Sequence, residues 1–155
     1  MQSNWKSLES HKNCYFAGAI PSSLSNLKAL DYFDLHSNNL SGAIPSSLSN
    51  LKALDYFDLH SNNLSGAIPS SLSNLKDLTH IDLSYNNLEG SIPTSIGNVT
   101  EVTQFFIQSN NLIGQIPSSL SNLKDLTQID LSYNNFEGTL KVMSTLFSTK
   151  SQKRL

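Results

Sequence analysis

The chain has 155 residues, of which 38% are hydrophobic and 14% charged, and its formal net charge is −2. This length suits one domain, and the composition argues against an intrinsically disordered chain. The slight negative charge argues against a nucleic-acid partner, and no apolar run approaches the roughly 18 residues that span a bilayer.

Residues 1–18 precede the regular part of the sequence. Trp5 and Leu8 are three residues apart, which suggests the start of a helix that covers the next segment. Cys14 is the only cysteine, so an internal disulfide is excluded. Because Cys14 precedes Gly18 by the same spacing as Asn38 precedes Gly42, we interpret this flank as ending in a degenerate half repeat with Cys14 buried. A reactive or intermolecular thiol is the alternative.

Residues 19–138 consist of five units of equal length, which are 19–42, 43–66, 67–90, 91–114 and 115–138. All five prolines and six of the seven glycines recur at this period. The first two units are identical, and the other three vary the same pattern. Such a period is the signature of a solenoid in which each unit forms one turn of a coil.

Each unit predicts one short strand and one short turn of helix. In the first unit, the alternation around Phe33 and Leu35 predicts a half-buried strand with these two side chains inside. Apolar residues three apart in the segment 22–28 predict a helical or 3₁₀ turn on the opposite side. Gly42 allows a tight turn. We expect parallel strands near residues 32–35, 56–59, 80–83, 104–107 and 128–131.

One asparagine of each unit follows the strand by three residues. Its side-chain amide offers two donors and one acceptor, so a stacked column can bond the backbone of neighbouring turns. The predicted ladder consists of Asn38, Asn62, Asn86, Asn110 and Asn134.

Residues 139–155 form a second flank, because the repeat fails after Gly138. Leu140, Met143 and Phe147 are spaced as in a short amphipathic helix that would partly cap the last coil. A frayed tail is the alternative. The segment 150–155 is interpreted as a solvated basic end.

The pattern LxxLxxFxLxxNxLSGxIPxxL resembles the plant-type leucine-rich repeat over residues 14–138. The resemblance implies a right-handed α/β solenoid with a concave parallel β-sheet and short 3₁₀ or helical turns on its convex side. Repeats of this type occur in the ectodomains of plant receptor-like proteins and receptor kinases, which are extracellular or at the plasma membrane. They also occur in polygalacturonase-inhibiting proteins.

The chain departs from this family in its flanks. It lacks the paired cap cysteines, a signal peptide, a membrane span and a kinase, so it also resembles a truncated or engineered run of repeats. Expressed as written, it is expected in the cytoplasm. Uncapped coil ends expose strand edges through which the chain could self-associate.

The outward positions of the strands form columns in which tyrosines and one phenylalanine stand among polar side chains, as on binding faces. Phe106 takes a position that is aspartate in the other units, and we expect it to face solvent, either as an interface anchor or as a local divergence. The predicted concave binding face consists of Tyr32, Asp34, His36, Tyr56, Asp58, His60, His80, Asp82, Tyr85, Gln104, Phe106, Gln108, Gln128, Asp130 and Tyr133.

The sequence gives only weak indications of metal binding, catalysis or glycosylation. The aspartate column suits cations in principle, but it is explained by the family consensus, and we expect solvated carboxylates. His36 and His60 are close enough for a shared metal, but duplication of the whole unit explains them. We therefore expect no metal, no cofactor and no catalytic residue. Asn39, Asn63 and Asn98 begin glycosylation sequons, which would be used if the chain is secreted.

The sequence therefore predicts a non-enzymatic module that binds a protein or peptide on its concave face, as in plant receptors of defence or signalling. The first alternative is an enzyme inhibitor of the polygalacturonase-inhibiting type. The second is an engineered or rearranged scaffold without a native ligand. A flat face for carbohydrate or ice is disfavoured, because no threonine or aromatic column runs through all units.

Overall fold

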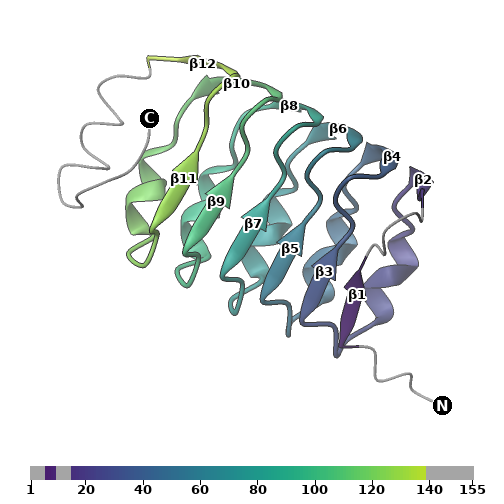
Figure 1. Cartoon of the computed structure of the whole chain (residues 1–155). Helices are drawn as coiled ribbons and strands as arrows, with labels where there is room; N and C mark the ends of the chain where they lie inside the picture. The colour runs from purple at the N-terminus through teal and green to yellow at the C-terminus, as the bar shows by residue number, and fades with distance from the viewer. Residues whose placement is uncertain (1–5, 10–14, 139–155) are drawn as a thin grey trace.

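The computed structural model describes residues 6–9 and 15–138. The chain winds as a coil in which each unit contributes one strand to each of two parallel sheets and one short 3₁₀ helix (Figure 1). The predictions for Trp5, Cys14 and the segment 139–155 lie outside the described residues. The leucine-rich-repeat solenoid is confirmed.

The first sheet contains the predicted strands. They pair in parallel, one beside the next, and each is one residue shorter than expected at its end. Its members in spatial order are β1 (Ser7–Glu9), β3 (Tyr32–Asp34), β5 (Tyr56–Asp58), β7 (His80–Asp82), β9 (Gln104–Phe106) and β11 (Gln128–Asp130).

Strand β1 corrects the expectation of a helix near Leu8. Ser7–Glu9 pairs with β3, and the backbone N–H groups of Asp31 and Tyr32 both donate to the carbonyl of Lys6. The first repeat would otherwise present an unpaired strand edge, and satisfying those backbone groups outweighs local helix spacing. Leu8 packs against the core from this strand.

A second parallel sheet, not predicted from the sequence, runs along the other edge of the coil. Gly42 lies inside β4 with φ +75°, so the expected tight turn is a left-handed bend within a strand. The equivalent glycines of the other units repeat this conformation. The strands in spatial order are β12 (Asn135–Glu137), β10 (Asn111–Gln115), β8 (Asn87–Gly90), β6 (Asn63–Ala67), β4 (Asn39–Ala43) and β2 (Ala17–Ala19).

Short 3₁₀ helices cover the side opposite the first sheet. Each begins after a proline, whose carbonyl accepts the first helical hydrogen bond, as in the 3.1 Å bond from Leu24 N to Pro21 O. The described residues contain no α-helix, so the helical part of the fold is limited to these single turns. They are η1 (Ser22–Asn26), η2 (Ser46–Asn50), η3 (Ser70–Asn74), η4 (Thr94–Asn98) and η5 (Ser118–Asn122).

Leucine, isoleucine and phenylalanine side chains fill the coil from end to end as one continuous cluster. Phe33 and Phe57 are fully buried, with ring centroids 5.4 Å apart. In the fourth unit, Phe105 and Ile107 are also fully buried. The alternation predicted for that strand is therefore correct, and Phe106 lies on the outer side of the sheet.

The asparagine column occupies the turn between the two sheets. Asn86 Oδ1 accepts a 3.0 Å hydrogen bond from Leu64 N in the preceding unit, and its Nδ2 donates to Leu59 O at 2.9 Å. Asn62, Asn110 and Asn134 make the same pair of bonds to their own preceding units. Backbone groups that lie between the sheets are thereby satisfied.

Candidate binding face

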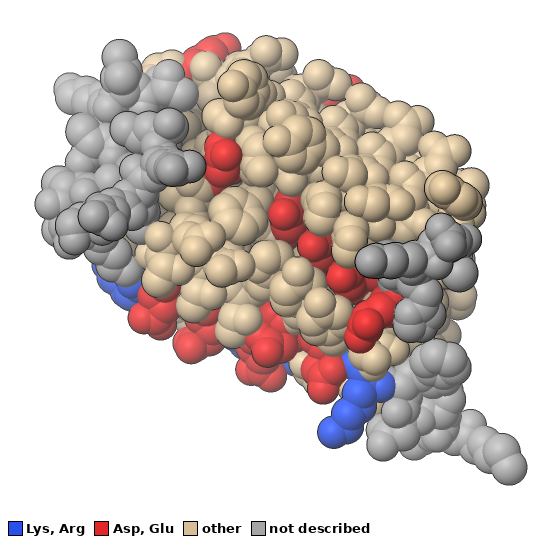
Figure 2. Space-filling view, in the orientation of Figure 1, with Lys and Arg blue, Asp and Glu red and all other residues tan. Residues whose placement is uncertain are grey.

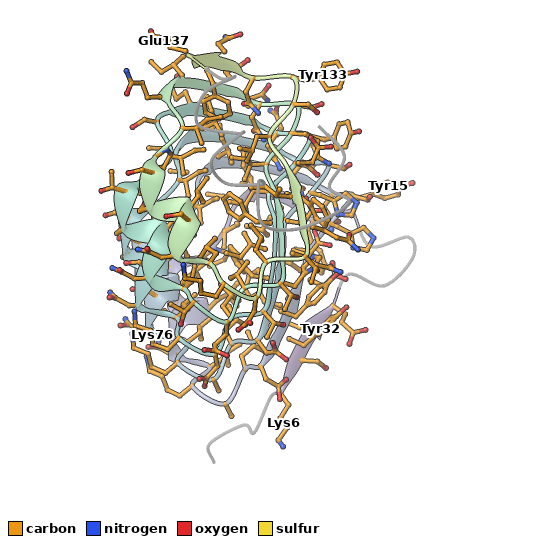
Figure 3. All side chains as sticks on the ribbon, turned by 90° about the vertical axis from the view of Figure 1, so that its left-hand side faces the viewer. Lys6, Tyr15, Tyr32, Lys76, Tyr133 and Glu137 are labelled. Atoms are coloured by element: carbon orange, nitrogen blue, oxygen red, sulfur yellow. The ribbon has the colours of Figure 1, made fainter. Side chains whose placement is uncertain are left out.

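The outer side of the first sheet, called here the first-sheet face, carries the predicted columns in register. The strand pairing aligns Tyr32 with Tyr56 and His80, and continues this column through Gln104 to Gln128. It aligns the aspartates in the same way, with Phe106 replacing aspartate in the fourth unit. Tyr32 lies on one side of the coil, and Lys76 lies among the 3₁₀ helices on the opposite side (Figure 3).

The first row on this face is aromatic. The Tyr32 and Tyr56 rings stack with centroids 4.3 Å apart, and Tyr56 and His80 stack at 4.2 Å. Phe106 ends the row by presenting its ring edge-on to His80, with centroids 6.1 Å apart. Stacked rings of this kind form a rigid, partly apolar ridge that loses little conformational entropy when a ligand packs on it.

A second row follows the strands. His36 and His60 stack in nearly parallel planes, with centroids 4.6 Å apart. The later units place Ser84, Gln108 and Ser132 at the same position of the repeat. The aromatic and histidine rows flank the aspartate column on both sides.

Two of the aspartates are a correction to the sequence analysis, which expected solvated carboxylates, whereas Asp82 and Asp130 are partly exposed. Asp34 and Asp58 are only 9% and 4% exposed, because the two flanking rows cover them. Each instead accepts a backbone hydrogen bond from the histidine two residues later, 2.9 Å long in the case of His60 N and Asp58 Oδ1. These carboxylates are part of the packed face rather than of its solvent layer.

The Asp58–His60 pair has a defined electrostatic character. Burial alone would raise the pKa of Asp58, but hydrogen bonds from the His60 side chain and backbone outweigh burial and lower this pKa below its ordinary value. The hydrogen bond to Asp58, 2.8 Å from Nδ1 to Oδ1, raises the pKa of His60. In the next unit Ser84 replaces the histidine, and burial raises the pKa of Asp82.

Two acceptor-capable atoms on the face are buried and lack a hydrogen-bond partner among the described residues: His80 Nε2 and Gln108 Oε1. The other ring nitrogen of His80, Nδ1, lies 2.7 Å from Gln104 Oε1. Buried polar atoms are seldom left unpaired in native proteins, so donors of a ligand would satisfy both once the neighbouring side chains move aside.

The sequence analysis missed Glu9. Strand β1 pairs Glu9 with Asp34, so a continuous column of Glu9, Asp34, Asp58 and Asp82 runs over four strands. Figure 2 shows this line of acidic side chains crossing the face. Glu9 and Asp34 are slightly further apart in the sequence than Asp34 and Asp58, which explains why a search at the repeat period does not find Glu9.

The lysines of the repeats lie away from this face. Lys28, Lys52 and Lys76 each donate from Nζ to the carbonyl of the serine three residues earlier, in the 3₁₀ helices. The aromatic, aspartate and histidine columns contain no lysine or arginine among the described residues. The repeat lysines therefore do not neutralise the acidic column of the first-sheet face.

Other predicted site residues lie apart from the rows. Tyr85 and Tyr133 are exposed at left-handed backbone positions, with φ +53° for both, in the turn beyond the strands. Their rings make no part of the aromatic row. The sequon residues Asn39 and Asn63 are exposed on the second sheet, and Asn98 ends η4. Glycans at these sites would leave the first-sheet face open.

The coil of paired parallel strands defines a protein of the leucine-rich-repeat class. Two family models described as leucine-rich repeat match residues 29–51 and 56–112. The chain belongs to the leucine-rich-repeat family, and its structural neighbours show that its repeats are of the plant receptor type. A comparison with curated proteins found no match.

Solved structures of plant receptors are similar over most of the chain. The ectodomain of the Arabidopsis thaliana membrane receptor kinase GASSHO1/SCHENGEN3, in complex with CASPARIAN STRIP INTEGRITY FACTOR 2, is 38% identical with a TM-score of 0.84, over 89% of this chain and 16% of that one. The Arabidopsis HAESA ectodomain, in complex with an IDA peptide hormone, is 38% identical with a TM-score of 0.82, over 91% and 24%.

A third neighbour is the BIR3–SERK2 complex from Arabidopsis thaliana, at 39% identity and a TM-score of 0.71, over 79% of this chain and 64% of that one. The chain thus spans 16 to 24% of the length of the GASSHO1/SCHENGEN3 and HAESA chains. None of the helices in the described ranges has the length and apolar character needed to cross a bilayer.

Proposed function

We propose that the chain recognises a peptide or protein on its first-sheet face, as part of plant signalling or defence. The observation that carries this proposal is the aromatic row from Tyr32 to Phe106, packed beside a column of carboxylates of which Asp34 and Asp58 are buried. The unpaired His80 Nε2 and Gln108 Oε1 add unused hydrogen-bonding capacity on the same face. Two of the similar structures are complexes with a peptide hormone or with a named signalling factor, which supports a ligand of this kind.

The charge of the face indicates which ligands suit it. Four carboxylates in adjacent strands, with the repeat lysines on the opposite side, favour a ligand segment that carries lysine, arginine or a free amine. The aromatic row favours an apolar or aromatic side chain beside that cation. The ligand is therefore expected to be a basic, amphipathic peptide segment.

Phe106 is the proposed anchor. It is half-buried at the end of the aromatic row, where the aspartate column is interrupted.

Peptides that are selected from a random display library by binding to the full chain should be enriched in basic residues. Phe106→Ala should weaken their binding by about 2 kcal/mol, measured by isothermal titration calorimetry, because interface anchors of this type contribute at least that much.

The matched control is Ile113→Ala. Ile113 is an exposed apolar side chain on β10 of the second sheet, far from the proposed contact. Equal losses of affinity in the two variants would contradict the placement of the ligand. Phe106→Ala should lower the stability of the free chain only slightly, because the ring touches His80 but fills no core volume.

Two alternative functions, an enzyme inhibitor and a scaffold without a native ligand, predict different results for the same chain. An inhibitor of the polygalacturonase-inhibiting type would cover an enzyme's substrate cleft with this face, and inhibition of a purified polygalacturonase that Phe106→Ala abolishes would support it. A run of repeats without a native ligand would yield neither inhibition nor selected peptides that depend on Phe106.

A further inference from the structure

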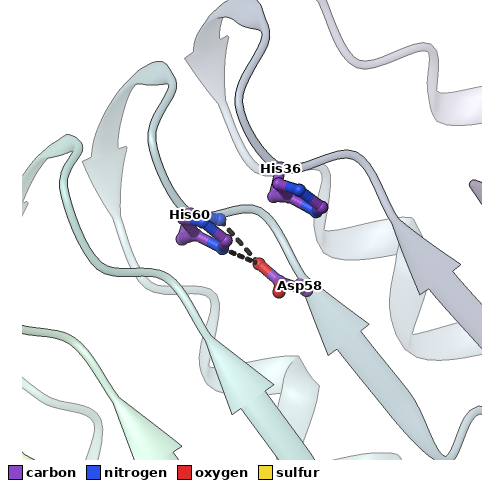
Figure 4. Close-up of side chains that lie close together, drawn as sticks. All are labelled: His36, Asp58 and His60. Atoms are coloured by element: carbon purple, nitrogen blue, oxygen red, sulfur yellow. Dashed lines mark hydrogen bonds and ion pairs between the residues drawn. The ribbon is translucent and has the colours of Figure 1, made fainter. Parts of the chain in front are cut away.

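Three potential metal ligands from adjacent units meet on the first-sheet face. His36 comes from the first unit, and Asp58 and His60 come from the second (Figure 4). Each offers one ligand atom, and these three atoms all lie within 4.8 Å of one another. The two imidazoles are 39% and 30% exposed, whereas the Asp58 side chain is 6% exposed. The carboxylate is therefore the more enclosed ligand, and the exposed imidazoles are the groups that would turn to bind an ion.

We propose that His36, Asp58 and His60 form a binding site for a divalent transition-metal ion of the Zn²⁺ type. Imidazole nitrogen and carboxylate oxygen are the ligands that such ions take, and three protein ligands leave a position for water. With bonds of about 2.1 Å, tetrahedral ligand atoms lie about 3.4 Å apart, so the more distant atoms need to approach by about 1.4 Å at most, and His60 Nδ1 and Asp58 Oδ1 need to separate by about 0.6 Å. Small rotations of the exposed imidazoles supply that movement.

One pair of ligands is already close enough to bind the same ion. His60 Nδ1 and Asp58 Oδ1 are 2.8 Å apart, and the ion would replace the proton that now lies between them. A neutral His60 then carries its proton on Nε2 instead, and a His60 imidazolium releases one proton, because a metal ligand has to be the neutral imidazole. The backbone N–H of His60 continues to orient the Asp58 carboxylate from 2.9 Å.

The surroundings supply the remaining requirements of a metal site. Asp34 Oδ1 lies 2.5 Å from His36 Nδ1 and holds that ring as an outer carboxylate. Asp82 Oδ2 lies 4.0 Å from His60 Nδ1 on the other side. With both imidazoles neutral, the three aspartates leave this cluster negatively charged, and a divalent cation would offset their repulsion.

The site depends on the identity of the first two units. The next units replace the histidine with Ser84 and Gln108, so only one junction in the described repeats brings two such histidines together. A second group of three, Asp58, His80 and Asp82, is less suited to an ion of the Zn²⁺ type, because it offers one imidazole and two carboxylates rather than two imidazoles. The sequence analysis considered the two histidines alone, without the buried carboxylate between their units.

The test is calorimetric titration of the full chain with ZnCl₂ in a non-chelating buffer at neutral pH. We expect one ion per chain, and His36→Gln and His60→Gln should each weaken binding by about 10-fold or more. His80→Gln is the matched control, since it removes a histidine from the same face but not from the site. Thermal unfolding without metal checks that each variant is folded.

A second control addresses ligands elsewhere in the sequence. The double variant His11→Gln/Cys14→Ser should bind zinc as the unchanged chain does. The proposal is wrong if this double variant abolishes binding, if His80→Gln weakens it while His36→Gln does not, or if the unchanged chain binds no zinc. A gain-of-ligand variant, Ser84→His, should strengthen binding or add a second ion, because it extends the histidine row by one unit.

Discussion

Asn86 illustrates how single polar residues hold the units together. Its side chain is almost fully buried, yet all its polar atoms are used: Oδ1 accepts from Leu64 N, and Nδ2 donates to Leu59 O and to carbonyls of its own turn. A leucine of similar size would fill the space but bond none of these groups. Its neighbour Asn87 is exposed, and its side chain donates to another surface asparagine, Asn63.

The first prediction compares these two asparagines. Asn86→Leu should lower the free energy of unfolding by about 2 kcal/mol, because Leu64 N–H and Leu59 C=O lose their buried partner. Asn87→Ala should change it by less than about 0.5 kcal/mol, as is usual for surface substitutions. Urea unfolding of both variants provides the measurement, and equal midpoints would refute the buried role of Asn86.

A second prediction concerns pH and the Asp58–His60 pair. The raised pKa of His60 stabilises the fold fully below 6.5, and this contribution is lost as pH rises through the raised value. The lowered pKa of Asp58 stabilises the fold above 3.8, and this contribution is lost as pH falls through the lowered value. The pair thus contributes most between 3.8 and 6.5.

His60→Gln should therefore lose stability relative to the unchanged chain mainly in that window, by about 0.5–1 kcal/mol for a partly exposed pair. Thermal unfolding across pH measures the difference. Asn87→Ala, which replaces a side chain that does not titrate, should show a constant offset. A deficit of His60→Gln that is equally large in alkaline solution would mean that packing, not charge, explains it.

The same residues show what sequence can and cannot predict at this scale. The outward position of Phe106 followed from the alternation with Phe105 and Ile107, which is local information. The burial of Asp34 and Asp58 was not predictable in this way, because it is produced by rings stacking between units. Such burial depends on neighbours that lie a full repeat away in the chain.

Among the secondary-structure elements, the 3₁₀ helices η4 and η5 pack more closely than their sequences suggest. The other units place serine where η4 has Gly97. A Cβ atom at Gly97 would overlap the carbonyl oxygen of Ser119 and lie 2.8 Å from its Cβ. Backbone of the next unit thus occupies the space that a side chain would need.

This packing gives the third prediction. Gly97→Ala should destabilise the fold by about 1–3 kcal/mol through overpacking. Propensity alone would predict the opposite, since alanine is favoured over glycine in helices by roughly 1 kcal/mol. Calorimetric melting of Gly97→Ala distinguishes the two. A raised melting temperature would mean that the two helices move apart at little cost.

The sequence analysis did not predict the second sheet, because its strands also depend on contacts between neighbouring units. Its strands contain a Ser-Gly or Glu-Gly pair in several units, and glycine indicates a turn when only the sequence is considered. The left-handed bend at Gly42 is compatible with strand pairing because the adjacent coil repeats the same bend. Stacking of equal units, not local preference, makes these segments strands.

For the whole molecule, the repeat makes each unit depend mainly on its neighbours. The first two units are identical, so removing residues 43–66 leaves a chain in which every junction still has its partners. The coil becomes one turn shorter, and the histidine row is reduced to His36. The stability of such proteins is close to a sum over units and their interfaces.

The fourth prediction follows from this deletion. The shortened chain should fold and unfold in one cooperative transition, with its urea m-value reduced by roughly a sixth, in proportion to the surface buried. It should also bind no zinc at the first-sheet face, because Ser84 then follows His36 in the row. Circular dichroism and the same titration test both points, and loss of the cooperative transition would contradict the additive description.

The asparagine ladder has a direction that bears on how the coil comes apart. Every asparagine bonds backbone groups of the unit before it: Asn134, for example, satisfies Leu112 N and Ile107 O. Removing the last coil therefore leaves backbone groups such as Leu112 N and Ile107 O without their asparagine. Removing the first coil instead leaves the Asn62 side chain without Leu40 N and Leu35 O, and the Asp55 and Tyr56 amides without the carbonyl of Asp31. Each end of the coil thus exposes a different set of unpaired groups, so a cap at the carboxyl end has to supply partners for ladder-turn backbone, whereas a cap at the amino end has to supply partners for an asparagine side chain and strand amides.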